Sequence, residues 1–296
     1  MKKVQEEIIS FYDYLKRVGM TAGTVKEYDR VVKSLLVQHP QAHEFGYRDV
    51  LGYLEELRKV GAEHSSRINK LGAIKKYYEY LIDQGIRGDH PCKRLYLKTP
   101  PKRAVIQGDL FTMDELESLF NTEWHFECLK AKNEVVLSLL IYQALSAKEI
   151  TSLKLHHIDL DAGTIFIRGG KRLTSRRLEL SPRQIRLFDQ YINNDRKRLL
   201  KEKDSDLFIV TLTGRGETSD GLCNFMEGLQ PRFPDRHLST MSIRDSVLSF
   251  LLNKRGLPLE QVQTFAGHRW ISSTQRYLQV PVEAEREVLK MYHPLR

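Results

Sequence analysis

The sequence predicts a mainly α (α+β) protein, in which a small helical domain precedes a larger helical domain that holds a small antiparallel β-sheet. The chain has 296 residues, which is enough for two domains with separate cores. Apolar residues recur at helical spacing over most of its length. Alternation typical of strands is confined to one short region, and a basic segment rich in Pro and Gly separates the two parts.

The first 87 residues predict a four-helix domain. Gly19 is expected to end the first helix, and Thr21 or Thr24 to cap the second. The apolar stripes fall in four segments: 4–17, 24–35, 47–60 and 65–84. Segment 88–108 then places prolines among lysines and arginines. Because proline lacks the amide hydrogen and biases its predecessor to extended backbone, we predict a basic interdomain linker there.

The second predicted domain, 109–296, opens with a capping-box signature, Thr112 followed by Glu115. Residues 164–168 and 177–180 alternate as two strands on either side of a Gly-Gly turn. A Ser-Pro pair at 181–182 predicts a helix with proline at its first position. The expected helices of this domain are 133–143, 147–155, 182–200, 223–230 and 241–253.

The chain is basic, with 47 Lys and Arg against 38 Asp and Glu, a net charge of +9. The surplus is uneven, because residues 1–106 hold 20 basic and 13 acidic residues whereas the other 190 hold 27 and 25. A basic N-terminal third indicates a polyanionic partner, nucleic acid before an anionic membrane surface. A basic surface without a specific partner is the alternative that charge alone leaves open.

Cysteine usage and hydropathy indicate a soluble, cytoplasmic protein. Cys92, Cys128 and Cys223 are widely spaced and lack the spacing of zinc ligands, so neither a disulfide framework nor a metal site is expected. The first seven residues are too polar for a signal peptide, and no apolar run approaches the roughly 18 residues of a membrane span. No membrane partner is therefore expected.

Four chemically useful side chains follow one another in the second half of the chain. Lys171 comes after the Gly-Gly turn, Arg244 begins an apolar helix, His268 follows Gly267, and Tyr277 comes nine residues later. Breaking a phosphodiester without a metal needs a nucleophile, cations for the non-bridging oxygens, a proton donor and a proton acceptor. The order and spacing of these residues resemble those of the tyrosine recombinases, the phage-integrase family.

The resemblance implies a site-specific DNA recombinase that cleaves and rejoins DNA through a 3′-phosphotyrosyl intermediate and belongs to a mobile element. Tyr277 would be the nucleophile, and Lys171 the general acid for the 5′ oxygen. Arg244 and His268 would hold the phosphate. The resemblance implies no cofactor and no metal.

The first catalytic arginine of the family is missing from this chain. Residues 144–153 align with the family motif Gly-Leu-Arg-x-x-Glu-Leu, with Glu149 retained and Ser146 in the place of the arginine. Lys148 and Arg172 are the cations that we consider as replacements. Lys148 lies about 200° around a helix from Ser146 and is a poor stand-in unless the backbone is irregular.

The family motif His-x-x-Arg-His also departs from its usual form. Met241 replaces the histidine that assists proton transfer, Arg244 is retained, and Asp245 replaces the second histidine. His237, one helical turn before Met241, is a candidate substitute. We expect a site rebuilt around these changes.

The N-terminal domain and the tail carry the expected contacts with DNA and with other subunits. The helix at 65–84 loosely resembles the last long helix of the family's core-binding domain, and a solvated face is the alternative for its cations. The tail at 285–294 resembles that of Xer-type recombinases, where it docks on a neighbouring subunit. The resemblance implies double-stranded DNA as partner, a homo-oligomer that forms a tetramer on two DNA sites, and association with a bacterial nucleoid. The predicted DNA-binding residues are Arg67, Lys70, Lys75 and Lys76.

Two other functions remain open at this stage. One is a catalytically silent, recombinase-fold accessory protein that binds DNA and has lost the chemistry. The other is a type IB topoisomerase, which shares the nucleophile but needs no defined site or tetramer, and the Xer-like tail argues against it.

Overall fold

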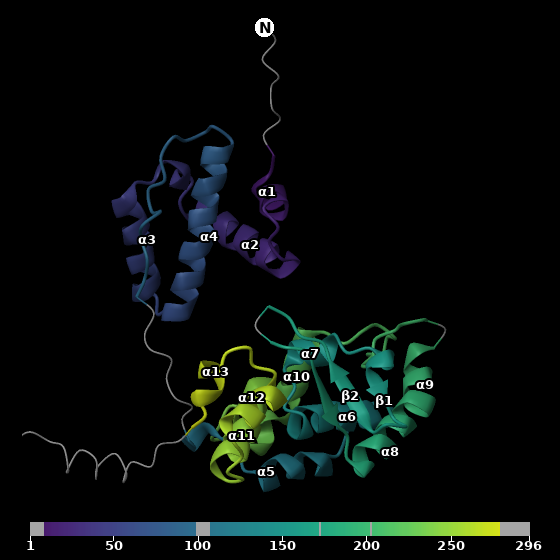
Figure 1. Ribbon diagram of the computed structural model, residues 1–296. Helices are drawn as coiled ribbons and strands as arrows, with labels where there is room; N and C mark the ends of the chain where they lie inside the picture. Colours follow the sequence, from purple (N-terminus) through teal and green to yellow (C-terminus); the bar gives the residue numbers. More distant parts are fainter. Residues whose placement is uncertain (1–8, 99–106, 172, 202, 279–296) are drawn as a thin grey trace, which may run out of the picture. The chain divides into compact units, whose positions relative to one another are not determined.

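The structure is a computed structural model that describes residues 9–98, 107–171, 173–201 and 203–278. The chain divides into two compact units, Met1–Pro101 and Lys102–Arg296 (Figure 1). The fold is mainly helical with a small antiparallel sheet, which confirms the predicted class. The division falls inside the predicted linker 88–108. Residues 99–106 of that linker lie outside the described part, so the predicted boundaries stay a prediction.

Unit 1 is built of α-helices. Ser10 and Thr21 cap the first two helices, because their side-chain oxygens accept hydrogen bonds from the backbone N–H groups of Asp13 and Thr24. The first helix was expected from residue 4, but residues 9 and 10 are not helical, and residues 1–8 lie outside the described part. The helices of this unit are α1 (Phe11–Arg17), α2 (Ala22–Gln38), α3 (Tyr47–Lys59) and α4 (His64–Asp83).

The core of unit 1 is rich in tyrosines that come mainly from α4. Tyr78 is fully buried and donates to the Ala42 carbonyl at 2.7 Å, while Tyr80 donates to the Ile9 carbonyl at 2.8 Å. These bonds satisfy the hydroxyls inside an apolar core. The chain before α1 and the turn after α2 are thereby tied to α4.

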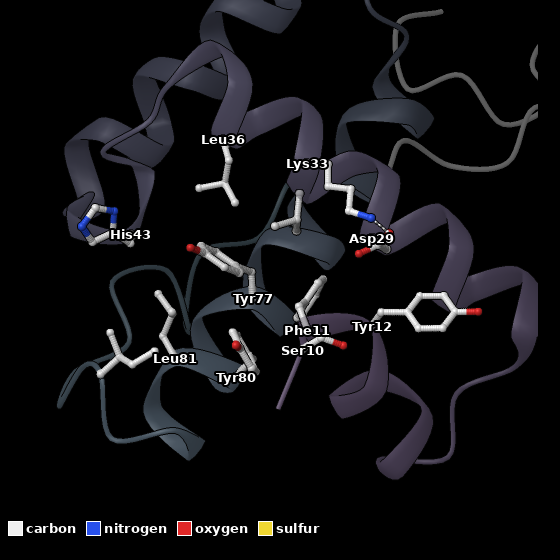
Figure 2. A pocket seen from close by; sticks show the side chains of 12 residues that line it. Ser10, Phe11, Tyr12, Asp29, Lys33, Leu36, His43, Tyr77, Tyr80 and Leu81 are labelled. Atoms are coloured by element: carbon white, nitrogen blue, oxygen red, sulfur yellow. Dashed lines mark ion pairs between the residues drawn. The ribbon is translucent and has the colours of Figure 1, made fainter. Parts of the chain in front are cut away.

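A hollow opens beside this core (Figure 2). Aromatic and aliphatic side chains dominate its lining, among them Phe11, Tyr77 and Tyr80. The Lys33 ammonium drawn at its edge pairs with the Asp29 carboxylate at 2.7 Å. The hollow lies in a different unit from the four residues singled out by the sequence.

In unit 2, α8 (Pro182–Gln190) and α11 (Thr240–Asn253) pack against α6 (Lys130–Tyr142), whose side chains are buried on nearly every face. Within the described residues, no helix combines the length and the hydropathy needed to cross a membrane. A one-turn π-helix, Tyr191–Asp195, lies between α8 and α9. The helices are α5 (Met113–Ser118), α6 (Lys130–Tyr142), α7 (Ala147–Thr151), α8 (Pro182–Gln190), α9 (Arg196–Leu200), α10 (Ser219–Leu229), α11 (Thr240–Asn253), α12 (Leu259–Ala266) and α13 (Ser272–Gln275).

The sheet of unit 2 has three antiparallel strands in the order β1-β2-β3. These are β1 (Ile158–Asp159), β2 (Thr164–Ile167) and β3 (Arg176–Glu179). The pairing aligns Ile165 with Leu178 and Ile167 with Arg176. The sequence predicted β2 and β3 but not β1, because two residues are too few to show alternation.

The backbone just after α6 supplies a hydrogen-bond acceptor to the candidate site. Ala144 has left-handed backbone (φ 49°), and the Leu145 N–H bonds to the Leu139 carbonyl at 3.2 Å. A left-handed residue just past a helix end is a common terminator, and glycine is the usual residue there. The chain reverses here, and the Ala144 carbonyl becomes an acceptor for the Arg244 side chain.

Candidate active site

Arg244 is held rigidly near the start of α11. Its side chain is buried, and its two terminal nitrogens donate to the backbone carbonyls of Ala144 and Ala266, the latter at 2.7 Å. The Glu149 carboxylate lies 3.7 Å from Nη1. Burial lowers the pKa of Arg244 and the Glu149 charge opposes that shift. Arg244 therefore presents a fixed positive charge between the end of α6 and the end of α12.

His268 follows the left-handed Gly267, which ends α12 with φ 70°. Its Nε2 lies 3.2 Å from Nη2 of Arg244, and its Nδ1 lies 2.9 Å from the Thr274 hydroxyl. Because a guanidinium donates and never accepts, we assign the Nε2 lone pair as acceptor and place the proton on Nδ1. Burial lowers the pKa of His268 to about 4, helped by the charges of Arg244 and Arg176. The imidazole is therefore neutral at pH 7.

Tyr277 is buried and lies two residues after the end of α13. Its ring stacks on the His268 ring, with centroids 6.1 Å apart and planes within 5°. Its hydroxyl donates to Oδ1 of Asp245 at 2.8 Å, and its carbonyl accepts from the Asn253 amide at 2.7 Å. Burial raises the pKa of Tyr277, and the Asp245 carboxylate raises it further. The phenol therefore keeps its proton until a neighbouring base takes it.

Asp245 is the ionisable group in contact with that phenol. Burial raises the pKa of its carboxyl, which strengthens it as a base. In the sequence analysis Asp245 was noted only as the residue that replaces the second histidine of the family motif. His237, the candidate substitute, is exposed in the loop before α11, and Met241 is 56% exposed in the first turn of that helix.

Lys171 lies exposed in the loop between β2 and β3. This loop is bonded to the segment that carries His268, because the Thr174 N–H donates to the Gly267 carbonyl at 2.8 Å and Leu173 forms a β-bridge with His268. The backbone bearing Lys171 is thus anchored beside the site. Its predicted role as a proton donor stays a prediction.

Ser146, in the place of the family arginine, has a local structural task. It caps α7, and Glu149 accepts from its N–H at 2.9 Å and from its hydroxyl at 2.8 Å. The other Glu149 oxygen accepts from Nη1 of Arg176 at 2.7 Å. Burial acts to raise the pKa of Glu149, but Arg176 and Ser146 outweigh burial and lower it. The carboxylate is therefore ionised at neutral pH.

Arg176 is the site residue that the sequence analysis missed. Its side chain is only 3% exposed, and it lies on β3 opposite the buried Ile167. The alternation that turns Leu178 inward also turns Arg176 inward, since side chains two apart share a face. A charged residue at a core position of a strand was the signal that could have revealed it.

The cations predicted to bind DNA do not share one face of α4. At 100° per residue, Lys76 lies about 180° from Arg67 around the helix. The Lys75 ammonium donates to the Lys93 carbonyl at 3.1 Å, and the Lys76 ammonium pairs with Glu79. Lys70 lies half-buried on the same helix. Their contact with DNA stays a prediction.

No group of three or more His, Cys, Asp or Glu side chains with the arrangement of a metal site occurs in the described ranges. The site consists instead of a phenol, an imidazole, two buried guanidinium groups and two carboxylates.

Profiles of two protein families match this chain. The profile of the phage integrase family matches residues 110–283, and that of the phage integrase N-terminal SAM-like domain matches residues 8–85. Tyrosine recombinase XerD of Halalkalibacterium halodurans is 25% identical over 303 residues, which cover 99% of this chain and 99% of the relative. Tyrosine recombinase XerC of Bacillus subtilis is 28% identical over 255 residues, which cover 85% of this chain and 82% of the relative.

Solved structures share the fold. The Tn1549 transposon integrase in complex with transposon right end DNA gives a TM-score of 0.64 at 14% identity, over 96% of this chain and 98% of that one. The XerH recombinase bound to its difH substrate gives 0.63 at 18% identity, over 90% of this chain and 77% of that one. With one family profile covering more than half of its length, the chain belongs to the phage integrase family, the tyrosine recombinases.

Proposed function

We propose that this protein cleaves and rejoins double-stranded DNA at specific sites, with Tyr277 as the nucleophile of a 3′-phosphotyrosyl intermediate. One observation supports the proposal above the others. His268 stacks on Tyr277 and lies within hydrogen-bond distance of Arg244, which brings a phenol, an imidazole and a guanidinium into one buried cluster. This set suits attack on a phosphodiester. The Tn1549 integrase structure contains transposon right end DNA, which supports DNA as the partner.

The proposed step balances in protons and charge. The Tyr277 oxygen attacks phosphorus while its proton passes to the Asp245 carboxylate. The bond from phosphorus to the 5′ oxygen breaks, its electron pair stays on that oxygen, and Lys171 supplies the proton. Arg244 stabilises the charge on the non-bridging oxygens. In the reverse step the free 5′ hydroxyl attacks the phosphotyrosyl bond and restores the phenol.

His268 must change its hydrogen bonding when DNA binds. Its Nε2 accepts from Arg244, so in that tautomer it cannot donate to a phosphate. A bound phosphodiester carries a negative charge, which favours the protonated imidazole and opposes the effect of burial on its pKa. Both His268 and Arg244 could then donate to the phosphate.

The test is covalent trapping on a nicked duplex whose sequence comes from the DNA flanking the gene. Wild type should give a protein–DNA adduct, whereas Tyr277→Phe should give none and should bind the duplex normally. Asp245→Asn should retain the nucleophile and form the adduct about 10²–10⁴-fold more slowly, because general-base catalysis typically contributes that much. An adduct that persists in Tyr277→Phe would sink the assignment of the nucleophile.

A second candidate is a catalytically silent DNA-binding protein of this fold. The observation in its favour is Ser146, which caps α7 where the family carries a catalytic arginine. Such a protein would bind the duplex and form no adduct under any condition, whereas a recombinase would form one.

The proposal extends to partners and setting. We propose a homo-oligomer, a tetramer on two DNA sites, assembled through the tail at 285–294, which lies outside the described residues. The setting would be the bacterial cytoplasm, at the nucleoid, with the protein serving a mobile element. Removing residues 283–296 should then leave single-site binding intact and prevent the pairing of two sites in a native gel.

A further inference from the structure

We propose that Arg176, from β3, binds the non-bridging oxygens of the scissile phosphate in place of the arginine that the family carries at the position of Ser146. This inference rests on the proposed function, because it names a phosphate-binding group for the same reaction. It concerns a residue of different origin, since the family arginine precedes α7 whereas Arg176 comes from the sheet.

The free edge of the guanidinium is the first observation. Arg176 uses Nη1 for Glu149, and its Nε and Nη2 are buried without a hydrogen-bond partner among the described residues. Nε and Nη2 form the side-on fork that binds two oxygens of a phosphate or carboxylate. A buried donor left unpaired costs roughly 1–3 kcal/mol, and more when it is charged. Two such donors on one edge indicate a ligand acceptor.

The place of the guanidinium is the second observation. Arg176 packs against Gly267, where a Cβ atom would collide with it, and Gly267 directly precedes His268. Glu149 lies beside both Arg176 and Arg244. The two guanidinium groups thus flank one carboxylate, next to the imidazole that stacks on Tyr277.

Charge supports the same assignment. Arg176, Arg244 and Glu149 are all buried, and the two guanidinium groups share the Glu149 carboxylate, because the Asp245 carboxylate is bonded to the Tyr277 hydroxyl. The neighbouring imidazole is neutral. A buried guanidinium that shares its only bonded carboxylate with a second cation is incompletely paired, and incomplete pairing of a buried charge is costly. A phosphodiester carries one negative charge and can therefore pair with these cations.

The other candidates for the missing cation are less suitable. Lys148 is exposed on α7, and Ser146 itself is committed to capping that helix. Arg172 lies outside the described residues. Arg176 combines burial, a charge and an unpaired fork, and it contacts the carboxylate to which Ser146 is also bonded.

The experiment compares two suicide duplexes that differ at one atom. Duplexes are first selected from a random pool by binding to wild type, and the scissile position is mapped from the adduct. One duplex then carries the normal phosphodiester there and the other a methylphosphonate, which replaces a charged oxygen with a methyl group. Single-turnover rates of adduct formation are measured for wild type, Arg176→Gln and Arg176→Lys.

We expect Arg176→Gln to react about 10²–10³-fold more slowly than wild type on the phosphodiester, the usual effect of one lost donor to a developing oxyanion. On the methylphosphonate the same variant should lose less than about tenfold, because the charged oxygen that Arg176 serves is gone. Arg176→Lys keeps a charge for Glu149 and should recover part of the phosphodiester rate.

Arg196→Gln is the matched control. Arg196 is a buried arginine of the same unit whose guanidinium donates to the carbonyls of Ser205, Leu207 and Phe208. Its loss should destabilise the fold without altering the ratio of the two rates. If Arg176→Gln does not fold, Arg176→Gln combined with Glu149→Gln removes the buried carboxylate that has lost its Arg176 partner, and this double variant serves in its place.

The outcomes separate the two proposals. Equal loss on both duplexes would overturn the role of Arg176 and leave it a structural partner of Glu149. If wild type binds a selected duplex and forms no adduct, the recombinase proposal fails. In that case a set of duplexes with a methylphosphonate at each position in turn is used for binding. At one position the methylphosphonate should weaken DNA binding by wild type and leave binding by Arg176→Gln unchanged. If no position behaves in this way, the phosphate contact is rejected as well. If no duplex is selected, both proposals fail.

Discussion

His268 is a neutral group inside a cluster of charges, and its protonation links the site to stability. Its neighbours Arg244 and Arg176 are cations and Glu149 is an anion, while Thr274 bonds to its Nδ1. Protonating the imidazole in the folded protein would break its bond from Arg244, because both nitrogens would then be donors.

The pH dependence of unfolding follows from that pKa. Folded His268 titrates at about 4, and an unfolded histidine titrates near 6.5. Between these two pH values the unfolded chain binds more protons than the folded protein. The contribution of His268 to the free energy of unfolding is therefore complete above pH 6.5 and is lost as the pH falls towards 4. From pH 7 to pH 5 the loss should be about 2 kcal/mol.

Urea unfolding of wild type and His268→Gln at several pH values measures this contribution. The variant should lose about 2 kcal/mol less over the same interval, since the other titrating groups are common to both proteins. Parallel curves for the two proteins would show that His268 titrates normally in the folded state.

Ser146 offers a second test at the scale of one residue. Ser146→Arg removes the hydroxyl that caps α7 and puts a third cation beside Arg176 and Arg244, so we expect a loss of about 0.5–2 kcal/mol of stability and a slower cleavage rate. The measurement is single-turnover cleavage of a suicide substrate. A tenfold gain, which is about 1.4 kcal/mol of barrier, would instead show a vacant arginine position.

At the scale of elements, α11 positions the nucleophile from both of its ends. Asp245, near the first turn, accepts from the Tyr277 hydroxyl, and Asn253, at the last residue, donates to the Tyr277 carbonyl. Arg244 adds a link from the same helix to the end of α12. One helix therefore sets the distance between the phenol, its base and the guanidinium.

The turn that ends α12 joins this helix system to the sheet. Gly267 has left-handed backbone, its carbonyl accepts from Thr174, and its Cα faces the Arg176 side chain. Two separate requirements therefore fall on one residue. Glycine meets both, because it adopts positive φ at little cost and leaves room for the guanidinium.

Gly267→Ala should destabilise the protein by more than about 2 kcal/mol, since it adds a left-handed alanine at roughly 1–2 kcal/mol and displaces Arg176. In an Arg176→Ala background, Gly267→Ala should lower the free energy of unfolding only by the strain of an alanine with left-handed backbone. Denaturant unfolding of the four proteins of this double-mutant cycle measures the coupling.

Gly256→Ala is the control for that cycle. Gly256 lies after α11 with φ +64°, and a Cβ there meets nothing within 4 Å. It should cost the left-handed strain and show no coupling to Arg176. Equal behaviour of the two glycine substitutions would show that Arg176 does not need Gly267.

At the scale of the whole molecule, charge is distributed unevenly along the chain. Residues 1–106 carry a surplus of 7 positive charges, from 20 basic and 13 acidic residues. Observed affinity for DNA should therefore fall steeply with salt, by about 0.9 decade per decade of salt for each phosphate neutralised. The predicted share of α4 in these contacts can be measured from that slope.

Changing Lys70, Lys75 and Lys76 together to Gln should flatten the slope by up to about 3, if each lysine contacts one phosphate. The control changes Lys16, Lys33 and Lys59, exposed lysines of α1, α2 and α3, and removes the same charge. Equal slopes for the two triple variants would place the DNA contact away from α4.

The sequence by itself determined the features that local chemistry controls. Helical periodicity predicted most of the helices, but it gave α8 and α9 as one helix and did not give α12 or α13. The capping box of Thr112 with Glu115 and the Ser181-Pro182 start of α8 are present as expected. Alternation predicted β2 and β3. These signals act between residues that are close in the chain, so they can be recognised in the sequence without the tertiary structure.

Only the tertiary structure decided which groups meet. Asp245 and Tyr277 are 32 positions apart, and Arg176 and Glu149 are 27 apart, so no local pattern announces either contact. A motif comparison shows that an arginine is missing at Ser146, but it cannot show that β3 turns another arginine towards the same carboxylate. The strand register and the left-handed turn at Gly267 place Arg176 there, because burial and hydrogen bonding are satisfied between elements and not along the sequence.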